Sequence, residues 1–155
     1  MTKPHDMARD IGVALILFAI AFNLPYAWLA VNFHYPDILR QPPGAILSAF
    51  NDGGTPLILA WAFFALAALL FAPIAVAIGR VTNAPSGVAA MGVAAGITQA
   101  IGLSRWVYAV PGLSGSWQAA DEASRPGIET LFMTLHQFAG VGIGEAIGQT
   151  LTGFW

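Results

Sequence analysis

Cysteine is absent from the 155 residues, which excludes disulfides, thiolate catalysis and iron–sulfur ligation. Charged residues are also scarce: they make up 9% of the chain, compared with about 25% in ordinary soluble domains. A soluble domain of this size could not cover its surface with so few charges, whereas 57% hydrophobic residues suit a lipid solvent. The net charge of −2 provides no basic surface for nucleic acid. The composition therefore predicts an integral membrane protein whose main partner is the lipid bilayer.

Four apolar segments are long enough to cross a bilayer, whose hydrocarbon core needs about 20 helical residues. The predicted fold is an all-α membrane protein. It is a four-helix transmembrane bundle that forms a single domain, with short interfacial helices in the outer loops. The first two spans are the most apolar and are expected to face lipid, whereas the polar side chains of the fourth should be shielded by protein. The predicted spans cover residues 11–31, 56–80, 87–108 and 126–152.

Basic residues in the loops predict the orientation of the chain. Lys3, Arg9 and Arg80 fall on one side of an even number of helices. Arg40 and Arg125 fall on the other side. Because basic loops tend to stay in the cytoplasm, this balance predicts a cytoplasmic N-terminus.

Two long connections, residues 32–55 and 109–125, lie on the predicted outer side. They can either cap the bundle or build a site on that face, and the sequence leaves both readings open. In the first connection, apolar residues are expected to form short helices that lie on the membrane surface. These residues are Ile38, Leu39, Ile46, Leu47 and Phe50.

Small residues recur every four positions in the last two spans. Gly92 and Gly96 begin such a stripe in the third span, and Gly140, Gly144 and Gly148 form one in the fourth. In lipid, stripes of small residues let two helix backbones approach closely. The pattern predicts that the third and fourth helices form a tight pair, with a partner subunit or a second copy as the alternative contact.

A ligand-binding set is predicted around the outer end of the third span. Arg105 either extends its head group to the interface or pairs with an acidic loop residue such as Asp121 and closes a pocket with Trp106 and Arg40. His136 continues the glycine stripe, so it is expected to face protein near the middle of the bilayer. A packing role is the simplest one for this histidine, and ligand contact is the alternative.

A buried charge is predicted in the fourth span. A carboxylate inside the membrane is costly unless it is protonated or paired, so Glu145 is expected to pair with Arg80, with proton carriage as the alternative. Nine residues separate His136 from Glu145, which is about 2.5 turns of α-helix and places the two on opposite faces. The two side chains are therefore not expected to act on one substrate.

Known catalytic motifs are missing: the sequence has no HExxH, GxSxG or P-loop pattern. No catalytic residue, metal site or cofactor is predicted, and an enzyme is not the favoured reading. The other histidines, His5 and His34, are not expected at the depth of His136, which disfavours a haem held by two histidines of one chain. The sequence does not decide whether a haem or another pigment binds in a different way.

From about residue 10 to the end, the sequence resembles the bacterial integral-membrane family catalogued as domain of unknown function 4386. The resemblance implies a bacterial inner-membrane location and a longer protein of about six membrane helices, so the last helices are expected to be missing here. It brings no established activity, and it makes Arg40, Arg105, Asp121, His136 and Glu145 the first residues to test. It rests on the stretches 35–40, 53–54, 103–106, 110–111 and 140–148, together with His136.

Three functions follow as hypotheses. The first is an accessory or structural subunit that packs against a larger membrane complex, favoured by the glycine stripes and the lack of a catalytic motif. The second is a small-molecule-binding or sensory protein with an outer pocket around Arg105 and Asp121. The third, least favoured because of the opposite faces, is a proton-coupled carrier or membrane enzyme that uses His136 and Glu145.

Overall fold

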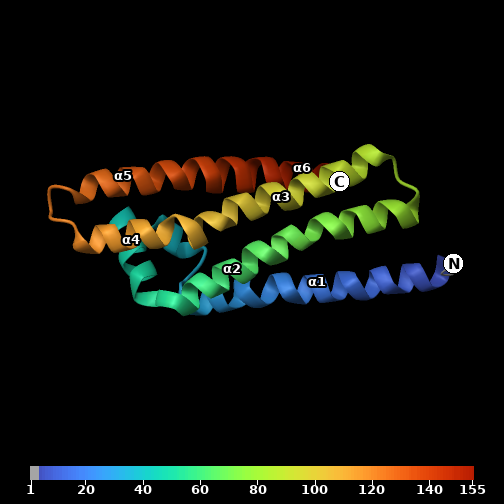
Figure 1. Ribbon diagram of the computed structural model, residues 1–155, viewed down its shortest axis with the longest axis horizontal. Coiled ribbons are helices and arrows are strands. Elements are labelled where there is room, and N and C mark those ends of the chain that lie inside the picture. The colour runs from blue at the N-terminus through green and yellow to red at the C-terminus, as the bar shows by residue number, and fades with distance from the viewer. Residues whose placement is uncertain (1–3) are drawn as a thin grey trace.

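The computed structural model describes residues 4–155, with side chains from Arg9 onward, so Lys3 and the side chain of His5 lie outside the described residues. Every regular element in this part of the chain is a helix (Figure 1), which confirms the predicted all-α class. The elements are α1 (Pro4–Asn32), the 3₁₀ turn η1 (Asp37–Arg40), α2 (Pro43–Thr82), α3 (Ser86–Tyr108), α4 (Val110–Ala119), α5 (Arg125–Leu135), the π-helix η2 (His136–Ile147) and α6 (Gly148–Phe154).

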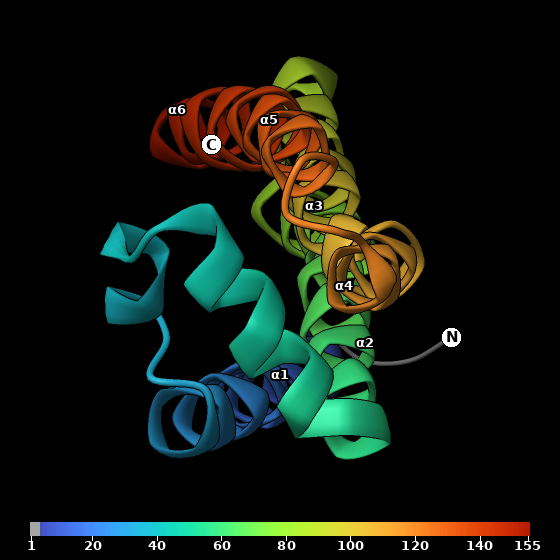
Figure 2. The ribbon, with the colours of Figure 1, turned by 90° about the vertical axis from the view of Figure 1, so that its left-hand side faces the viewer.

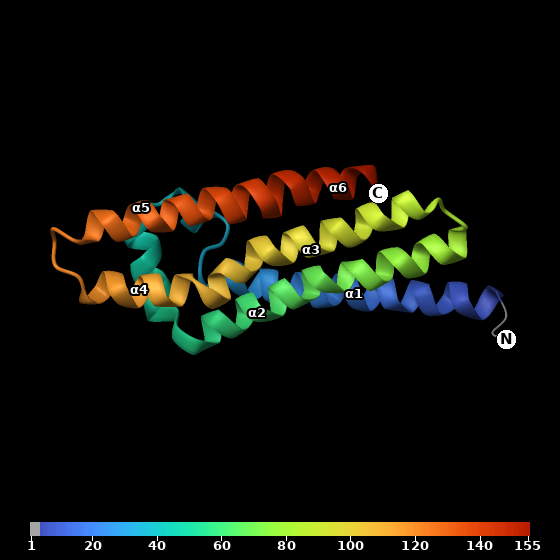
Figure 3. The same ribbon diagram turned by 45° about the horizontal axis from the view of Figure 1, so that its top comes forward.

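Three helices are long and apolar enough to cross a membrane: Arg9–Asn32, Pro43–Thr82 and Ser86–Ala119. Large apolar side chains are exposed along α1 and on one side of α2, where lipid would cover them. The predicted fourth span corresponds to α5, η2 and α6, which follow one another as a single rod beside α3 and α4 (Figure 3). That this rod crosses the membrane stays a prediction.

Helix α2 (Pro43–Thr82) consists of two helical parts that meet at a kink at Gly54, and the predicted second span, which starts at Pro56, corresponds to the longer part. Residues 43–53 are already helical, and the chain then bends at Gly54, whose φ of 54° and ψ of −150° suit only glycine. Pro56 lacks the N–H that would continue the hydrogen-bond ladder, which reinforces the bend. The expected surface helices are wrong for this segment, because Ile46 and Phe50 are buried in the core.

The helices form an open arc and not a closed four-helix bundle. Helix α2 packs against α1 on one side and along α3 on the other, and α3 packs against η2 and α6. In the view along the helices, α1 and α6 lie at opposite ends of the arc (Figure 2). Helix α2 is therefore central, and its apolar window is 33% buried, against 11% for the first helix.

The connection 109–125 is largely helical, because α4 continues the line of α3 almost directly after Tyr108. Together they contain the 34 residues Ser86–Ala119, which extend about 51 Å at 1.5 Å per residue. A bilayer core is only about 30 Å thick. The hairpin of α4 and α5 extends past the end of α1 in Figure 1, so this end of the molecule continues beyond the membrane-spanning part of α1.

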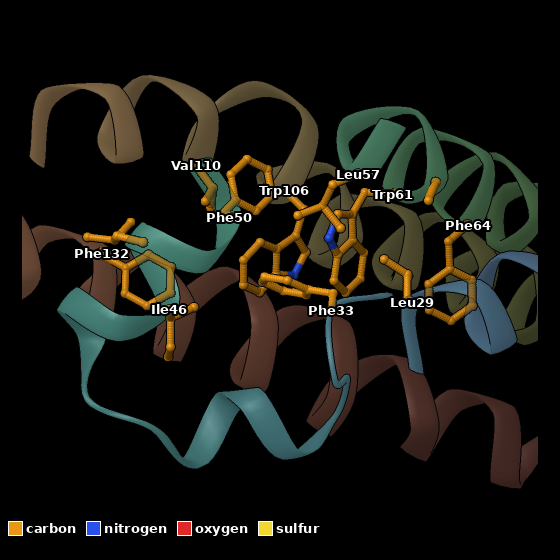
Figure 4. Packing of buried hydrophobic residues seen from close by; sticks show 12 residues of the cluster. Leu29, Phe33, Ile46, Phe50, Leu57, Trp61, Phe64, Trp106, Val110 and Phe132 are labelled. Atoms are coloured by element: carbon orange, nitrogen blue, oxygen red, sulfur yellow. The ribbon is translucent and has the colours of Figure 1, made fainter. Parts of the chain in front are cut away.

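The hydrophobic core lies at the level where α1 ends. Phe33 follows α1 directly, and its ring is 5.6 Å from Trp106 and 6.2 Å from Trp61. The two indoles stack with centroids 4.8 Å apart and an interplanar angle of 10° (Figure 4). Aromatic side chains from four segments thus lock α2 and α3 to the end of α1, and the core residues include Leu29, Phe33, Ile46, Leu47, Phe50, Leu57, Trp61, Phe64, Trp106, Val110 and Phe132.

Candidate functional site

Arg105, near the C-terminal end of α3, is buried with only 6% of its surface exposed. Its Nη1 donates to the backbone oxygen of Gly102, and its Nη2 lies 3.3 Å from Nδ1 of His136. Its Nε is buried and has no hydrogen-bond partner within the described chain. A guanidinium carries five N–H donors, so most of its hydrogen-bonding capacity is left unused. The residue does not extend to the interface, which was one of its two predicted positions.

His136 starts η2 and packs against Arg105. Because a guanidinium can only donate, Nδ1 of the imidazole must accept, which leaves the proton on Nε2 and the ring neutral. The ring also stacks on Phe132, with centroids 6.0 Å apart. Phe132 in turn contacts Trp106 of the aromatic core. The histidine therefore faces protein, and its depth in the bilayer stays a prediction.

The π-helix η2 changes the geometry that the sequence suggested. Hydrogen bonds from residue i to i+5 widen the helix to roughly 4.4 residues per turn. His136, Gly140, Gly144 and Gly148 then all fall on the side of α3, and Glu145, directly after Gly144, lies about a quarter-turn from His136 and not on the opposite face. The predicted opposite faces hold only for an α-helix and are wrong here. Both residues are on the side that faces Arg105, since His136 contacts it and Glu145 lines the same cavity.

A cavity of about 120 Å³ lies inside the arc, between α1, α2, α3 and η2. Arg105 and Glu145 both contribute to its wall, and Tyr35 of the α1–α2 connection lines it too. The remaining lining residues are Phe22, Phe64, Gln99, Gly102, Leu103, Gly140, Gly144 and Gln149. The walls are thus part aromatic and part polar, with one basic and one acidic side chain.

The pKa of Tyr35, which lies in the α1–α2 connection outside the predicted spans, depends on the charges around this cavity. Burial raises the pKa of the Tyr35 hydroxyl above its ordinary value of 10.0; the carboxylate of Glu145 raises it further, and the guanidinium of Arg105 lowers it. The hydroxyl is therefore neutral at physiological pH and able to donate a hydrogen bond into the cavity. Both charges act on the same phenol.

Gly140, Gly144 and Gly148, the stripe predicted in the fourth span, face α3. A Cβ on Gly144 would lie 3.0 Å from the Cα of Gly102, and one on Gly148 would lie 2.7 Å from Cγ of Gln99. Gly140 leaves room for the guanidinium, because a Cβ there would lie 2.5 Å from Cζ of Arg105. These three positions therefore allow the close contact of η2 and α6 with α3.

The glycines of the third span have different partners from those expected. A Cβ on Gly96 would lie 3.0 Å from the backbone nitrogen of Ala72, so this residue faces α2. Gly92 faces Ala75 of α2 and the Trp155 ring. The contact with η2 is made instead by Gly102, which does not belong to the four-residue series.

The predicted outer pocket is only partly assembled. Arg40 pairs with Asp37 at 2.7 Å, and both side chains are exposed. Asp121 is exposed in the α4–α5 turn, where the Ser124 hydroxyl and N–H hold its pKa below the ordinary value. Neither residue lines the cavity with Arg105. Trp106 lies beside the guanidinium, with Arg105 Cζ 5.2 Å from its ring, but is fully buried.

The predicted ion pair between Glu145 and Arg80 is also wrong. The ion pairs of the described residues are Arg9–Asp10 and Arg40–Asp37. Arg80 is exposed near the end of α2, and Glu145 is exposed on the open side of the arc. The error follows from the open arrangement, because no helix of the described chain covers that side of η2 (Figure 2).

Sequence reasoning missed Gln99, Gly102 and Gln149 as wall residues. The i, i+4 spacing of Glu145 and Gln149 was a usable signal, because the two align on one helix face. In the described part of the chain, no group of three His, Asp or Glu side chains could hold a metal ion.

Helices throughout the described residues, three of them long and apolar enough to cross a membrane, define this chain as an all-helical protein of the membrane type. A family model, Domain of unknown function (DUF4386), matches residues 11–155. The chain therefore belongs to that family, and the resemblance found in the sequence is confirmed. No curated protein and no solved structure matches the chain.

Proposed function

We propose that this protein is a membrane-embedded binding or sensory protein for a small ligand with an anionic group, which Arg105 recognises. The carrying observation is the buried guanidinium, with no carboxylate in ion-pair contact among the described residues. A buried charge without a counter-charge is unfavourable by several kcal/mol. A carboxylate supplied by a ligand would offset this cost, because a guanidinium forms two parallel hydrogen bonds with it.

The cavity limits the size of this ligand. A water molecule occupies about 30 Å³, so the 120 Å³ of the cavity corresponds to a molecule of only a few non-hydrogen atoms. Tyr35 follows the end of α1 and lines the cavity with Arg105, which supports a position of this part of the cavity close to the membrane surface. The position of Tyr35 and Arg105 supports entry of the ligand from the end of the molecule that carries the α4–α5 hairpin.

Ligand-induced stabilisation tests this proposal with the full chain in lipid nanodiscs. Short carboxylates such as propanoate are added, and the melting temperature is followed. At a concentration one hundred times Kd, binding stabilises the folded state by about 2.7 kcal/mol, or about 5–10 °C for a chain of this size. We expect Arg105→Gln to abolish the shift and Arg105→Lys, which keeps the charge but loses the planar fork, to retain part of it.

Arg40→Gln is the matched control, because Arg40 is exposed and lies away from the cavity. It should leave the ligand-induced shift unchanged. Full retention of the shift in a folded Arg105→Gln protein would refute the proposal.

Proton-coupled transport is a second candidate, and the π-helix is the observation that favours it. His136 and Glu145 lie on the same side of η2, on either side of Arg105 along the helix. Acid-base side chains within a membrane commonly mark proton routes. Uptake of labelled propanoate into proteoliposomes should then depend on a pH gradient. Unchanged, gradient-driven uptake by the double variant His136→Ala and Glu145→Gln would exclude this candidate.

The accessory-subunit role predicted from the glycine stripes keeps one observation in its favour. Glu145 and Gln149 are exposed on the open side of η2 and α6, where a further membrane helix would shield them from lipid. Native electrophoresis after mild solubilisation separates the alternatives. A partner band or a second copy of the chain supports the role, and a lone monomer counts against it.

The bacterial inner membrane and a cytoplasmic N-terminus complete the proposal. They rest on the three apolar helices and on the distribution of basic loop residues. Reporter fusions placed after Thr82 and after Ala119 test the orientation. The first should report the cytoplasm and the second the outer side, and the reverse pattern would overturn it.

A further inference from the structure

The cavity carries two opposite charges that are not paired with each other. Arg105 and Glu145 both line it, yet the ion pairs in the described residues involve neither side chain. Tyr35 lines the same cavity, and the charges of Arg105 and Glu145 both act on its hydroxyl. The two charges are therefore close enough to share one ligand while leaving space between them.

Glycine on η2 makes room for the basic side chain of the cavity. Gly140 and Gly144 both line the cavity, and a Cβ on Gly140 would lie 2.5 Å from Cζ of Arg105. Because neither glycine carries a side chain, α3 and the guanidinium of Arg105 can lie directly against the backbone of η2. Phe22 and Phe64 line the wall from α1 and α2, and their rings suit a short hydrocarbon link between two charged groups.

The two charged side chains of the wall select the ligand class. The buried guanidinium of Arg105 offers donors to an anionic group, and the carboxyl group of Glu145, on the exposed part of the wall, offers acceptors to a cationic group. A simple anion or a simple amine can use only one of these two side chains. A molecule with both an anionic and a cationic group can pair with each of them.

We propose that the ligand is a small zwitterion of the amino-acid class. Its carboxylate binds the guanidinium of Arg105, and its ammonium group binds the carboxylate of Glu145. The inference rests on the proposed function, because it assigns a second contact to a ligand already placed at Arg105. Gln99 supports it: its amide nitrogen donates to Thr152 Oγ1 at 2.9 Å, which leaves its amide oxygen to accept from the ammonium group.

Three probes with the same carbon skeleton test the inference: 3-aminopropanoate, propanoate and propylamine. Equilibrium binding is measured with the full chain in nanodiscs at pH 7. A hydrogen bond to a charged group contributes about 1.5–3 kcal/mol, which corresponds to roughly 10-fold or more in Kd. We therefore expect 3-aminopropanoate to bind at least about 10-fold more tightly than either of the other probes.

Two variants separate this inference from the proposed function. Glu145→Gln should remove the preference for 3-aminopropanoate and bind propanoate at least as well as the wild type does. Glu145→Asp keeps the charge and should retain part of the preference for 3-aminopropanoate. This variant keeps the inference testable if Glu145→Gln fails to fold. Glu122→Gln makes the same chemical change in the exposed α4–α5 turn and should alter nothing.

Each outcome has a distinct meaning. If wild-type protein binds propanoate as tightly as 3-aminopropanoate, the zwitterion inference is wrong and the anion site stands. If Glu145→Gln keeps the full preference, the inference is also wrong, because the ammonium group is then held elsewhere. If propylamine binds best, or if no carboxylate binding depends on Arg105, both the inference and the proposed function fail.

Discussion

The substitution Gly102→Ala probes the contact on which the cavity depends. A Cβ at this position would lie 2.6 Å from the Cα of Gly144, 3.0 Å from the backbone oxygen of Ala139 and 3.1 Å from the nitrogen of Gly144. Carbon atoms pack best at about 3.5–4.0 Å. All three contacts are backbone atoms, so no side chain can move away, and η2 would have to separate from α3 by about 1 Å.

The expected cost follows from two opposing effects. Overpacking commonly destabilises a folded protein by about 1–3 kcal/mol, while replacing a helical glycine by alanine contributes about 0.5–1 kcal/mol of stabilisation. The net loss is about 1–2 kcal/mol, which lowers the melting temperature by about 2–8 °C for a chain of this length. Thermal unfolding of the detergent-solubilised protein, followed by circular dichroism, measures it.

Gly115→Ala in α4 is the matched control, because nothing lies within 4 Å of its added Cβ. It should leave the melting temperature unchanged or raise it by a few degrees, since it gains helix propensity without a clash. If Gly102→Ala proves as stable as Gly115→Ala, the close approach of α3 and η2 is wrong. The cavity geometry and the assignment of Glu145 to its wall would then also be wrong, because both depend on this close approach.

Three further predictions concern single contacts. Gly140→Ala should displace the guanidinium of Arg105, because the added Cβ would lie 2.5 Å from Cζ. The loss of charged hydrogen bonds should lower the free energy of unfolding by about 1.5–3 kcal/mol. Unchanged stability and unchanged ligand binding would contradict the displacement. Ser124→Ala should raise the pKa of Asp121 part of the way toward its ordinary value, as followed by NMR titration, because it removes the Ser124 hydroxyl bond and keeps the backbone N–H bond. The stabilisation by this hydroxyl should be present above the unfolded pKa of Asp121 and lost as pH falls through its folded pKa. An unchanged titration would show that the hydroxyl bond is absent. Arg40→Ala should change stability by less than about 1 kcal/mol, because its ion pair is exposed, and a larger loss in thermal unfolding would reveal a buried role.

Some errors of the sequence-based reading have one common cause. The i, i+4 recurrence of glycine was interpreted with an α-helical period, whereas residues 136–147 form a π-helix. The wider turn brings His136 and Glu145 to one side, which no periodicity argument at 3.6 residues per turn can reveal. The same recurrence still identified the face of η2 and α6 that contacts α3, because close packing needs only small side chains at these positions.

Other errors came from treating long connections as separate from the helices. Residues 43–53 and 110–119 carry prolines and glycines that indicate loops in isolation. In the structure, the proline that begins each segment stands in the first turn of a helix, where its missing N–H costs nothing. Packing of Ile46 and Phe50 onto the aromatic core then favours helix over the local turn propensity.

The sequence by itself determined the solvent, the helical class and the family of this protein. Scarce charge and long apolar runs leave a lipid environment as the fitting choice, and they are visible without any coordinates. Only the tertiary structure decided which charges share a site. Arg105 and Glu145 are 40 residues apart in the sequence, and they line one cavity because a π-helical turn and the Gly102–Gly144 contact bring η2 against α3. Such proximity depends on helix width and backbone approach, which a pattern of residue types does not encode.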